Sequence, residues 1–117
     1  MNQTTLTTVV RKSQQNIGII DIQGDVTGFA ENILMDAFSQ ASNGSTKAIL
    51  LNFSSLDYMN SSGIGLLVTL LIRTQRQKQK LMACGLSEHY EEIFKLTRLN
   101  EAIGIYTNES DALAALS

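Results

Sequence analysis

The sequence predicts a single α/β domain in which an N-terminal β-hairpin leads into a mixed, mostly parallel sheet of about four to five strands covered by about four helices. Strand-like and helix-like segments alternate from residue 24 onward, which is typical of parallel strands joined by crossover helices. Residues 48–51 are apolar at every position, as in a strand buried on both faces. The 117 residues contain no linker or repeat, so one domain spanning residues 1–117 is expected.

The first two strands are expected at residues 6–11 and 17–23. Both segments are rich in apolar and β-branched residues, and the polar stretch 12–16 between them favours a hairpin. Gly24 is expected to end the second strand, because glycine weakens strand interiors.

The first helix is expected from apolar residues that recur at helical spacing between Phe29 and Phe38. Asn43-Gly44 is expected to end it, since glycine readily adopts the left-handed conformation common at helix C-termini. The remaining strands and helices are expected in alternation at residues 47–53, 62–78, 81–84, 88–97, 103–105 and 110–115.

A loop with two adjacent hydroxyl groups precedes the second helix. Residues 57–67 read Asp-Tyr-Met-Asn-Ser-Ser-Gly-Ile-Gly-Leu-Leu. Ser61 and Ser62 therefore lie beside the free N–H groups of a helix start, where those donors and the helix dipole favour negative charge. A phosphate would be stabilised here. The alternative is that one serine merely caps the helix, a role worth about 1 kcal/mol.

This stretch resembles the signature loop of the anti-sigma factor antagonist family, also called the STAS domain family. The family typically reads Asp-Ser-Ser-Gly-Leu or Asp-Ser-Thr-Gly-Ile between a buried strand and an apolar helix. Gly24-Asp25-Val26 resembles the turn after the family's second strand, and residues 93–100, 105–106 and 110–113 resemble its closing helix, strand and helix. The resemblance covers nearly the whole chain and implies a STAS-like α/β fold.

The resemblance implies a partner-switching regulator. The family's phosphate acceptor is the hydroxyl immediately before the glycine, a place that Ser62 holds here, with Ser61 as the alternative acceptor. The unphosphorylated protein would bind a serine-kinase anti-sigma factor or related switch kinase, phosphorylation would release it, and a serine phosphatase would reverse the change. ATP and magnesium would belong to the kinase, so no cofactor or metal is expected in this chain. The alternative is a non-switching STAS scaffold or a module that binds a small ligand.

The residues expected to contact the partner surround the serines and the turn after the second strand. They are Asp25, Thr27, Asp57, Tyr58, Met59, Asn60, Ser61, Gly63, Ile64 and Leu66. Asn60 stands where the family usually has aspartate, which leaves the kinase and the phosphorylation rate open. Asn52 and Thr27 replace two further family aspartates, so the acidic rim of the site is weaker here.

The helix after the serines contains more apolar residues than one sheet contact requires. One set is expected to face the core, and a surplus set either forms a docking surface or packs against neighbouring helices. The core-facing set is Ile64, Leu67, Val68 and Leu71. The surplus set is Leu66, Leu70 and Ile72. Gly63 and Gly65 either allow a partner to approach closely or pack the helix start against the sheet.

Composition and motifs argue against other functions. The net charge of −2 gives no basis for binding nucleic acid. No nucleophile elbow, P-loop, dinucleotide loop or zinc spacing accompanies the single histidine, His89, so no enzymatic activity is expected. Cys84 is expected to be a buried thiol. No segment has the features of a secretion signal or the length of a membrane span, so a cytoplasmic protein without a membrane partner is expected.

Overall fold

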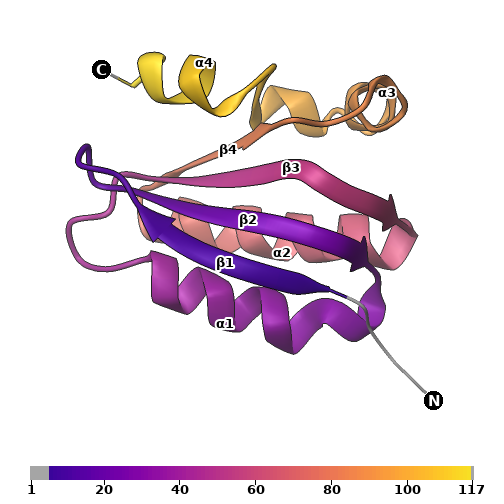
Figure 1. Ribbon diagram of the computed structural model, residues 1–117, viewed down its shortest axis with the longest axis horizontal. Coiled ribbons are helices and arrows are strands. Elements are labelled where there is room, and N and C mark those ends of the chain that lie inside the picture. Colours follow the sequence, from indigo (N-terminus) through magenta and orange to yellow (C-terminus); the bar gives the residue numbers. More distant parts are fainter. Residues whose placement is uncertain (1–5, 117) are drawn as a thin grey trace.

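The computed structural model describes residues 6–116 and contains a five-stranded sheet flanked by helices (Figure 1). The strands are β1 (Thr7–Lys12), β2 (Ile17–Val26), β3 (Ala48–Met59), β4 (Lys80–Cys84) and β5 (Gly104–Tyr106). The helices are α1 (Glu31–Ala41), α2 (Ser61–Arg76), α3 (Glu88–Leu96) and α4 (Glu109–Ala114), with short 3-10 helices η1 (Gly28–Ala30) and η2 (Leu99–Glu101). Residues 1–5, part of the segment searched for a secretion signal, lie outside the described residues.

The strands lie in the sheet in chain order, β1-β2-β3-β4-β5. β1 and β2 form an antiparallel hairpin, and all other neighbouring pairs are parallel. The predicted α/β architecture is therefore confirmed, including the hairpin. No helix within residues 6–116 is long and apolar enough to cross a membrane.

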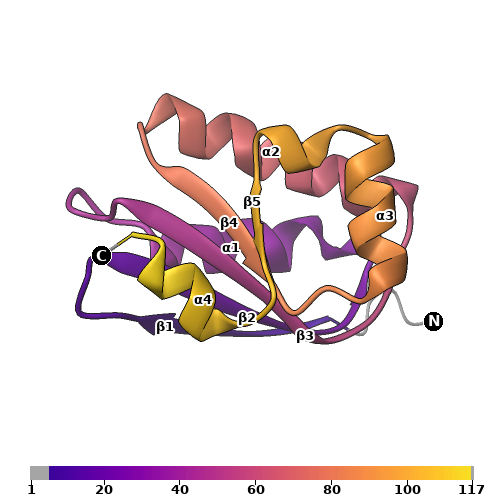
Figure 2. The same ribbon diagram turned by 90° about the horizontal axis from the view of Figure 1, so that it is seen from above.

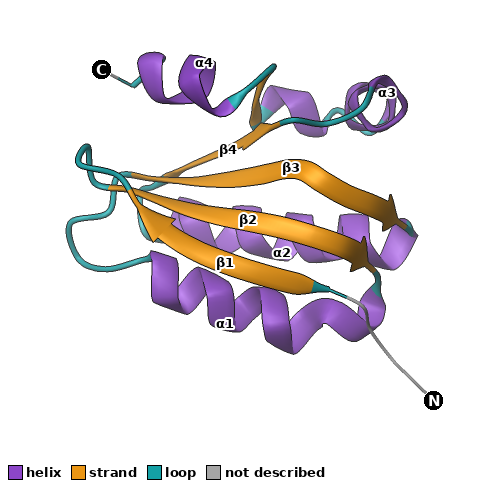
Figure 3. Cartoon of the chain, in the orientation of Figure 1, coloured by secondary structure: helices purple, strands orange, loops and turns teal. Residues whose placement is uncertain are grey.

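The helices cover the two faces of the sheet unequally. α1 and α2 lie side by side on one face, whereas the short α4 lies on the other (Figure 1, Figure 3). α4 packs on residues of β2, β3 and β4, and α3 lies at the other end of the molecule from the C-terminus (Figure 2). Ile49 and Leu51 enter the larger core with α1 and α2, while Ala48 and Leu50 enter the smaller core with α4. The prediction that residues 48–51 are buried on both faces is confirmed.

Gly24 lies within β2 and does not end it, contrary to the prediction. Its φ of 100° and the register shift between Gly24 and Asp25 mark a β-bulge, after which β2 continues to Val26. Glycine adopts positive φ without the steric penalty of a side chain. β3 likewise runs past the predicted end at residue 53 to Met59, so β2 and β3 finish together.

The end of α1 also differs from the prediction. The helix ends at Ala41, and Ser42 is extended (φ −106°, ψ 133°), so Asn43-Gly44 does not provide a left-handed cap. The Asn43 Oδ1 atom instead accepts a hydrogen bond from the Ser45 N–H at 2.8 Å within the following turn. Phe29, expected on the apolar face of this helix, precedes it in η1 and is 69% exposed.

Arg11 connects the hairpin to the C-terminal helix α4. Its guanidinium lies 2.6 Å from the Asp21 carboxylate and 2.6 Å from that of Glu109. The hydrogen bonds from Arg11 lower the pKa of Asp21 below its ordinary value. Asn52 donates to Asp21 Oδ1 at 3.0 Å, so this asparagine belongs to the same polar network. It lies in the middle of β3 and not near the strand end expected at residue 53. Cys84 is buried as predicted, and burial raises its pKa to about 11.

Candidate functional site

The ends of β2 and β3 and the start of α2 meet at one end of the molecule, at the right of Figure 1. The strand register places Asp25 beside Tyr58 and Val26 beside Met59. The Asn60 N–H donates to the Val26 carbonyl at 3.2 Å, and α2 begins at the next residue. The β-bulge at Gly24 therefore contributes to the site, because it lets β2 extend far enough to contact the residue before the serines.

Asn60 caps α2, and neither serine does so. Its side-chain oxygen accepts a hydrogen bond from the Gly63 N–H at 2.9 Å, and its backbone oxygen accepts one from the Ile64 N–H at 2.9 Å. The alternative in which Ser61 or Ser62 caps the helix is therefore wrong. Asparagine and aspartate are both strong N-cap residues, so Asn60 fills the cap without adding a negative charge.

Ser61 and Ser62 are both exposed in the first turn of α2. Within residues 6–116, neither side-chain hydroxyl forms a hydrogen bond. A hydroxyl in this position is accessible and can be esterified without the loss of an intramolecular hydrogen bond. The remaining free N–H groups of the helix start favour negative charge at the same place.

The turn between β2 and α1 passes close to Ser62. A Cβ atom at Gly28 would lie 3.3 Å from the Ser62 Cβ and 3.7 Å from its Oγ. Thr27 organises this turn, since its Oγ1 accepts a hydrogen bond from the Phe29 N–H at 3.3 Å. Gly28 and Phe29 were absent from the predicted site, although both follow directly after the Gly24-Asp25 turn that was included.

Three of the predicted partner-binding residues lie inside the protein. Met59 and Leu66 are only 4% and 8% exposed and belong to the core. Gly63 is buried, and a Cβ atom there would collide with the Val26 carbonyl, so close packing explains this glycine. By contrast, a Cβ atom at Gly65 would meet no atom within 4 Å beyond its own stretch of helix, so packing does not require glycine at that position.

The end of β3 is anchored by a residue that the sequence analysis did not select. The Tyr90 hydroxyl, on α3, accepts a hydrogen bond from the Met59 N–H at 2.8 Å. Tyr90 is 8% exposed, so this interaction is shielded from solvent. The anchor fixes the backbone immediately before the serine loop.

The core-facing side of α2 is rotated relative to the prediction. Val68 is 38% exposed, so the expectation that it faces the core is wrong, and the surplus residues Leu66 and Leu70 are buried. Of the surplus residues, only Ile72 is exposed, at 44%. The outward side of the helix has the residues Ser61, Gly65, Val68 and Ile72, which project within about 60° of one another at about 100° per residue. We call these four residues the outer stripe; it links the serine loop to two exposed apolar side chains.

Comparison with known proteins identifies the family. The STAS domain profile matches residues 8–112. The chain belongs to the STAS domain family. This confirms the resemblance inferred from the serine loop, the Gly24-Asp25-Val26 turn and the closing elements.

Solved structures share the fold of this STAS domain at low sequence identity. An anti-sigma factor antagonist from Mycobacterium paratuberculosis is 18% identical, with a TM-score of 0.81 over 96% of this chain and 94% of that protein. The phosphorylated form of the Bacillus cell fate determinant SpoIIAA is 20% identical, with a TM-score of 0.73 over 95% and 100%. A sulfate transporter family protein from Wolinella succinogenes is 16% identical, with a TM-score of 0.76 over 91% and 88%. The same fold thus occurs in proteins named for different functions.

The charged residues predicted at the site of this STAS domain are acidic. Asp57 is exposed and Asp25 is half-buried. The ion pairs recorded among residues 6–116 involve Arg11, Lys95 and Arg98, and none includes Asp25 or Asp57. A phosphate on Ser62 would therefore add to an existing negative charge while being favoured by the helix start.

Proposed function

We propose that this STAS domain is a partner-switching regulator of the anti-sigma factor antagonist type, and that phosphorylation of Ser62 controls its binding. The unphosphorylated form would bind a serine-kinase anti-sigma factor or a related switch kinase. The observation that carries the proposal is the division of roles at the helix start, where Asn60 supplies the cap and the Ser62 hydroxyl is exposed and unbonded among the described residues. The hydroxyl is therefore available for modification without loss of the cap.

An apolar surface beside Ser62 supports binding of a protein partner. Phe29 in η1 is 69% exposed and Tyr58 near the end of β3 is 51% exposed, and the outer stripe adds Val68 and Ile72. A partner that covers these side chains would also cover the Ser62 hydroxyl. A phosphate adds roughly −1.5 to −2 charges, and burying such a charge without a partner is unfavourable.

Phosphorylation would thus weaken the complex through one local change in charge. A coupling of about 1–3 kcal/mol, or roughly 5- to 150-fold in affinity, is typical of such switches. The kinase would supply ATP and magnesium, a serine phosphatase would restore the hydroxyl, and the domain itself would act in the cytoplasm as a binding protein with no catalytic role.

The decisive experiment compares three variants with the wild type: Ser62→Ala, Ser62→Asp and, as the matched control, Ser61→Ala. Each is titrated against the serine-kinase anti-sigma factor encoded in the same genome, then incubated with that kinase and ATP and examined by intact-mass and fragment-mass measurement. We expect Ser62→Ala to bind and remain unmodified, Ser62→Asp to bind at least fivefold more weakly, and Ser61→Ala to gain one phosphate at Ser62. Equal affinity of the two Ser62 variants would refute the switch.

The alternative from a different class is a non-switching scaffold or a small-ligand-binding module. The structural likeness to a sulfate transporter family protein is compatible with this alternative. Stable binding of the kinase without any added mass would favour the scaffold, because the surface would then be used without the switch.

A further inference from the structure

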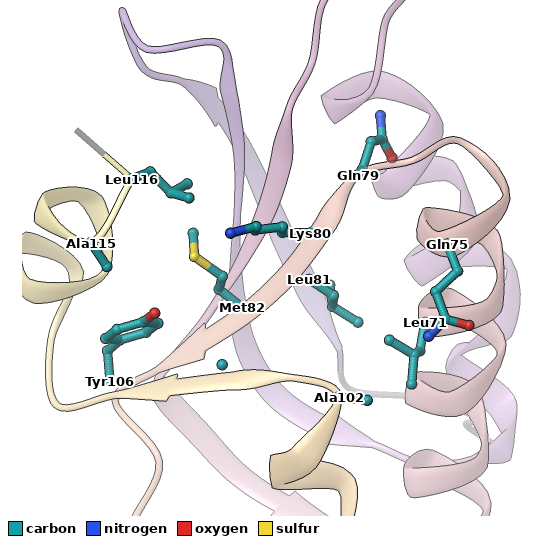
Figure 4. A pocket seen from close by; sticks show the side chains of 11 residues that line it. Leu71, Gln75, Gln79, Lys80, Leu81, Met82, Ala102, Tyr106, Ala115 and Leu116 are labelled. Atoms are coloured by element: carbon teal, nitrogen blue, oxygen red, sulfur yellow. The ribbon is translucent and has the colours of Figure 1, made fainter.

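A cavity of about 380 Å³ lies at the edge of the sheet beside β4. Figure 4 shows Leu71 and Gln75 of α2 on one side of β4 and Ala115 and Leu116 on the other. The cavity exists because β5 pairs only with residues Met82–Cys84 of β4. The first two residues of β4 have no β5 partner, so this part of the sheet edge remains open.

The cavity is lined by apolar side chains together with a few polar groups. The apolar side chains of Leu71, Leu81, Met82 and Leu116 are accompanied by the Tyr106 ring. Among residues 6–116, Lys80 is the only charged residue in the lining, and no acidic side chain from this range lines the cavity. Cavities of roughly 300–1,000 Å³ with an apolar wall and a small number of polar groups are typical of small-molecule sites.

The charge of Lys80 is available to a ligand. Lys80 is exposed and takes part in none of the ion pairs recorded among residues 6–116. The backbone N–H of Lys80 donates to the Lys47 carbonyl at 3.0 Å, which fixes the start of β4, while Lys47 itself is not part of the lining. A positive charge at the mouth of a cavity raises the local concentration of anions.

We infer that this cavity is a binding site for a small amphipathic anion, with its apolar body beside β4 and its carboxylate beside the Lys80 ammonium. The inference is independent of the proposed switch. β3 runs from Ala48 beside Lys80 to Met59 before the serine loop, and its 12 residues span roughly 35 Å at 3.3 Å per residue. The cavity and Ser62 therefore lie at opposite ends of the sheet.

The test uses the full chain and two probes that differ in charge, decanoate and decanol, each below its aggregation concentration. Backbone amide signals are followed by NMR during titration. We expect decanoate to produce saturable shifts centred on Leu81, Met82 and residues 104–106, and decanol to bind at least threefold more weakly. Shifts that do not saturate, shifts centred elsewhere, or equal binding of the two probes would overturn the inference.

Two variant pairs locate the charge effect. Lys80→Gln should weaken decanoate binding at least threefold and remove the preference over decanol, whereas Lys47→Gln, which loses the same charge outside the lining, should change binding less than twofold. Leu116→Asp should weaken decanoate binding at least threefold more than Leu116→Asn. The two new side chains are similar in size, but only aspartate adds a negative charge that repels the carboxylate. Equal effects of the two variants within either pair would count against the site. Ser62→Asp should leave decanoate binding unchanged, because Ser62 lies at the opposite end of the sheet.

Discussion

Gly63 and Gly65, two residues apart in the same helix, should respond oppositely to replacement by alanine. At Gly63 the added methyl group would collide with the Val26 carbonyl, which belongs to the backbone and cannot rotate away. The start of α2 must then move away from β2. At Gly65 the methyl group would enter open space on the outer stripe.

The magnitudes follow from these surroundings. Overpacking at Gly63 costs about 1–3 kcal/mol, and displacement weakens the hydrogen bond from the Gly63 N–H to the Asn60 cap, worth about 1 kcal/mol. The higher helix propensity of alanine offsets about 1 kcal/mol. Gly63→Ala should therefore lower the free energy of unfolding by about 1–3 kcal/mol, whereas Gly65→Ala should raise it by about 0.5–1 kcal/mol.

Urea unfolding measures both effects as shifts of the midpoint at constant slope. The two variants make the same chemical change in the same helix, so each is a control for the other. If Gly63→Ala were as stable as Gly65→Ala, the contact between the helix start and β2 would not be the reason for glycine at position 63. If Gly65→Ala kept its stability but bound the kinase partner more weakly, the outer stripe would be implicated in docking.

Four further variants test the residues that hold the site and the buried thiol of β4. Asn60→Ala should lose about 1 kcal/mol of stability through loss of the cap, while Asn60→Asp should retain it; equal urea midpoints for the two would argue against the cap. Tyr90→Phe should lower the free energy of unfolding by about 1–3 kcal/mol, because the buried Met59 N–H is left without its acceptor. The Met59 amide should exchange faster in this variant, and exchange slower than in the native protein would contradict the assignment. Since burial raises the pKa of Cys84 from 9.0 to about 11, the folded chain keeps a proton that the unfolded chain releases, so stability falls as pH rises between those values. Cys84→Ala should lack this part of the pH dependence in unfolding measurements; an unchanged profile would show that the thiol is not its source.

Much of the fold was readable from the sequence because local signals agreed with the tertiary structure. The uniformly apolar residues 48–51 identified the central strand, and the polar stretch 12–16 identified the hairpin. The prediction for Gly24 was wrong because a glycine that ends a strand and a glycine in a β-bulge have the same sequence pattern until the partner strand is known. β3 then proved to continue alongside β2 to Met59.

The rotation of α2 could not be predicted because its sequence contains two overlapping apolar stripes. The observed buried stripe includes the polar residue Thr74, which is fully buried. Its burial is tolerated because its hydroxyl donates a hydrogen bond to the Leu71 carbonyl at 2.8 Å within the helix. It also includes Gly63, whose contact with Val26 sets how closely the helix approaches the sheet. Neither interaction produces a periodic pattern of apolar residues in the sequence, so periodicity does not predict it. The serine loop itself was located correctly, but the cap by Asn60 and the anchor at Tyr90 depend on side-chain positions that spacing does not reveal.

The order of the strands has a consequence for how the chain is made. Every strand after the first is added next to the strand that precedes it in the chain, so a polypeptide emerging from the ribosome always has a completed neighbour available as a template. No segment must wait for a distant one before it can join, which keeps the entropy lost in closing each loop small. Assembly can therefore proceed from the N-terminal hairpin outward as translation advances.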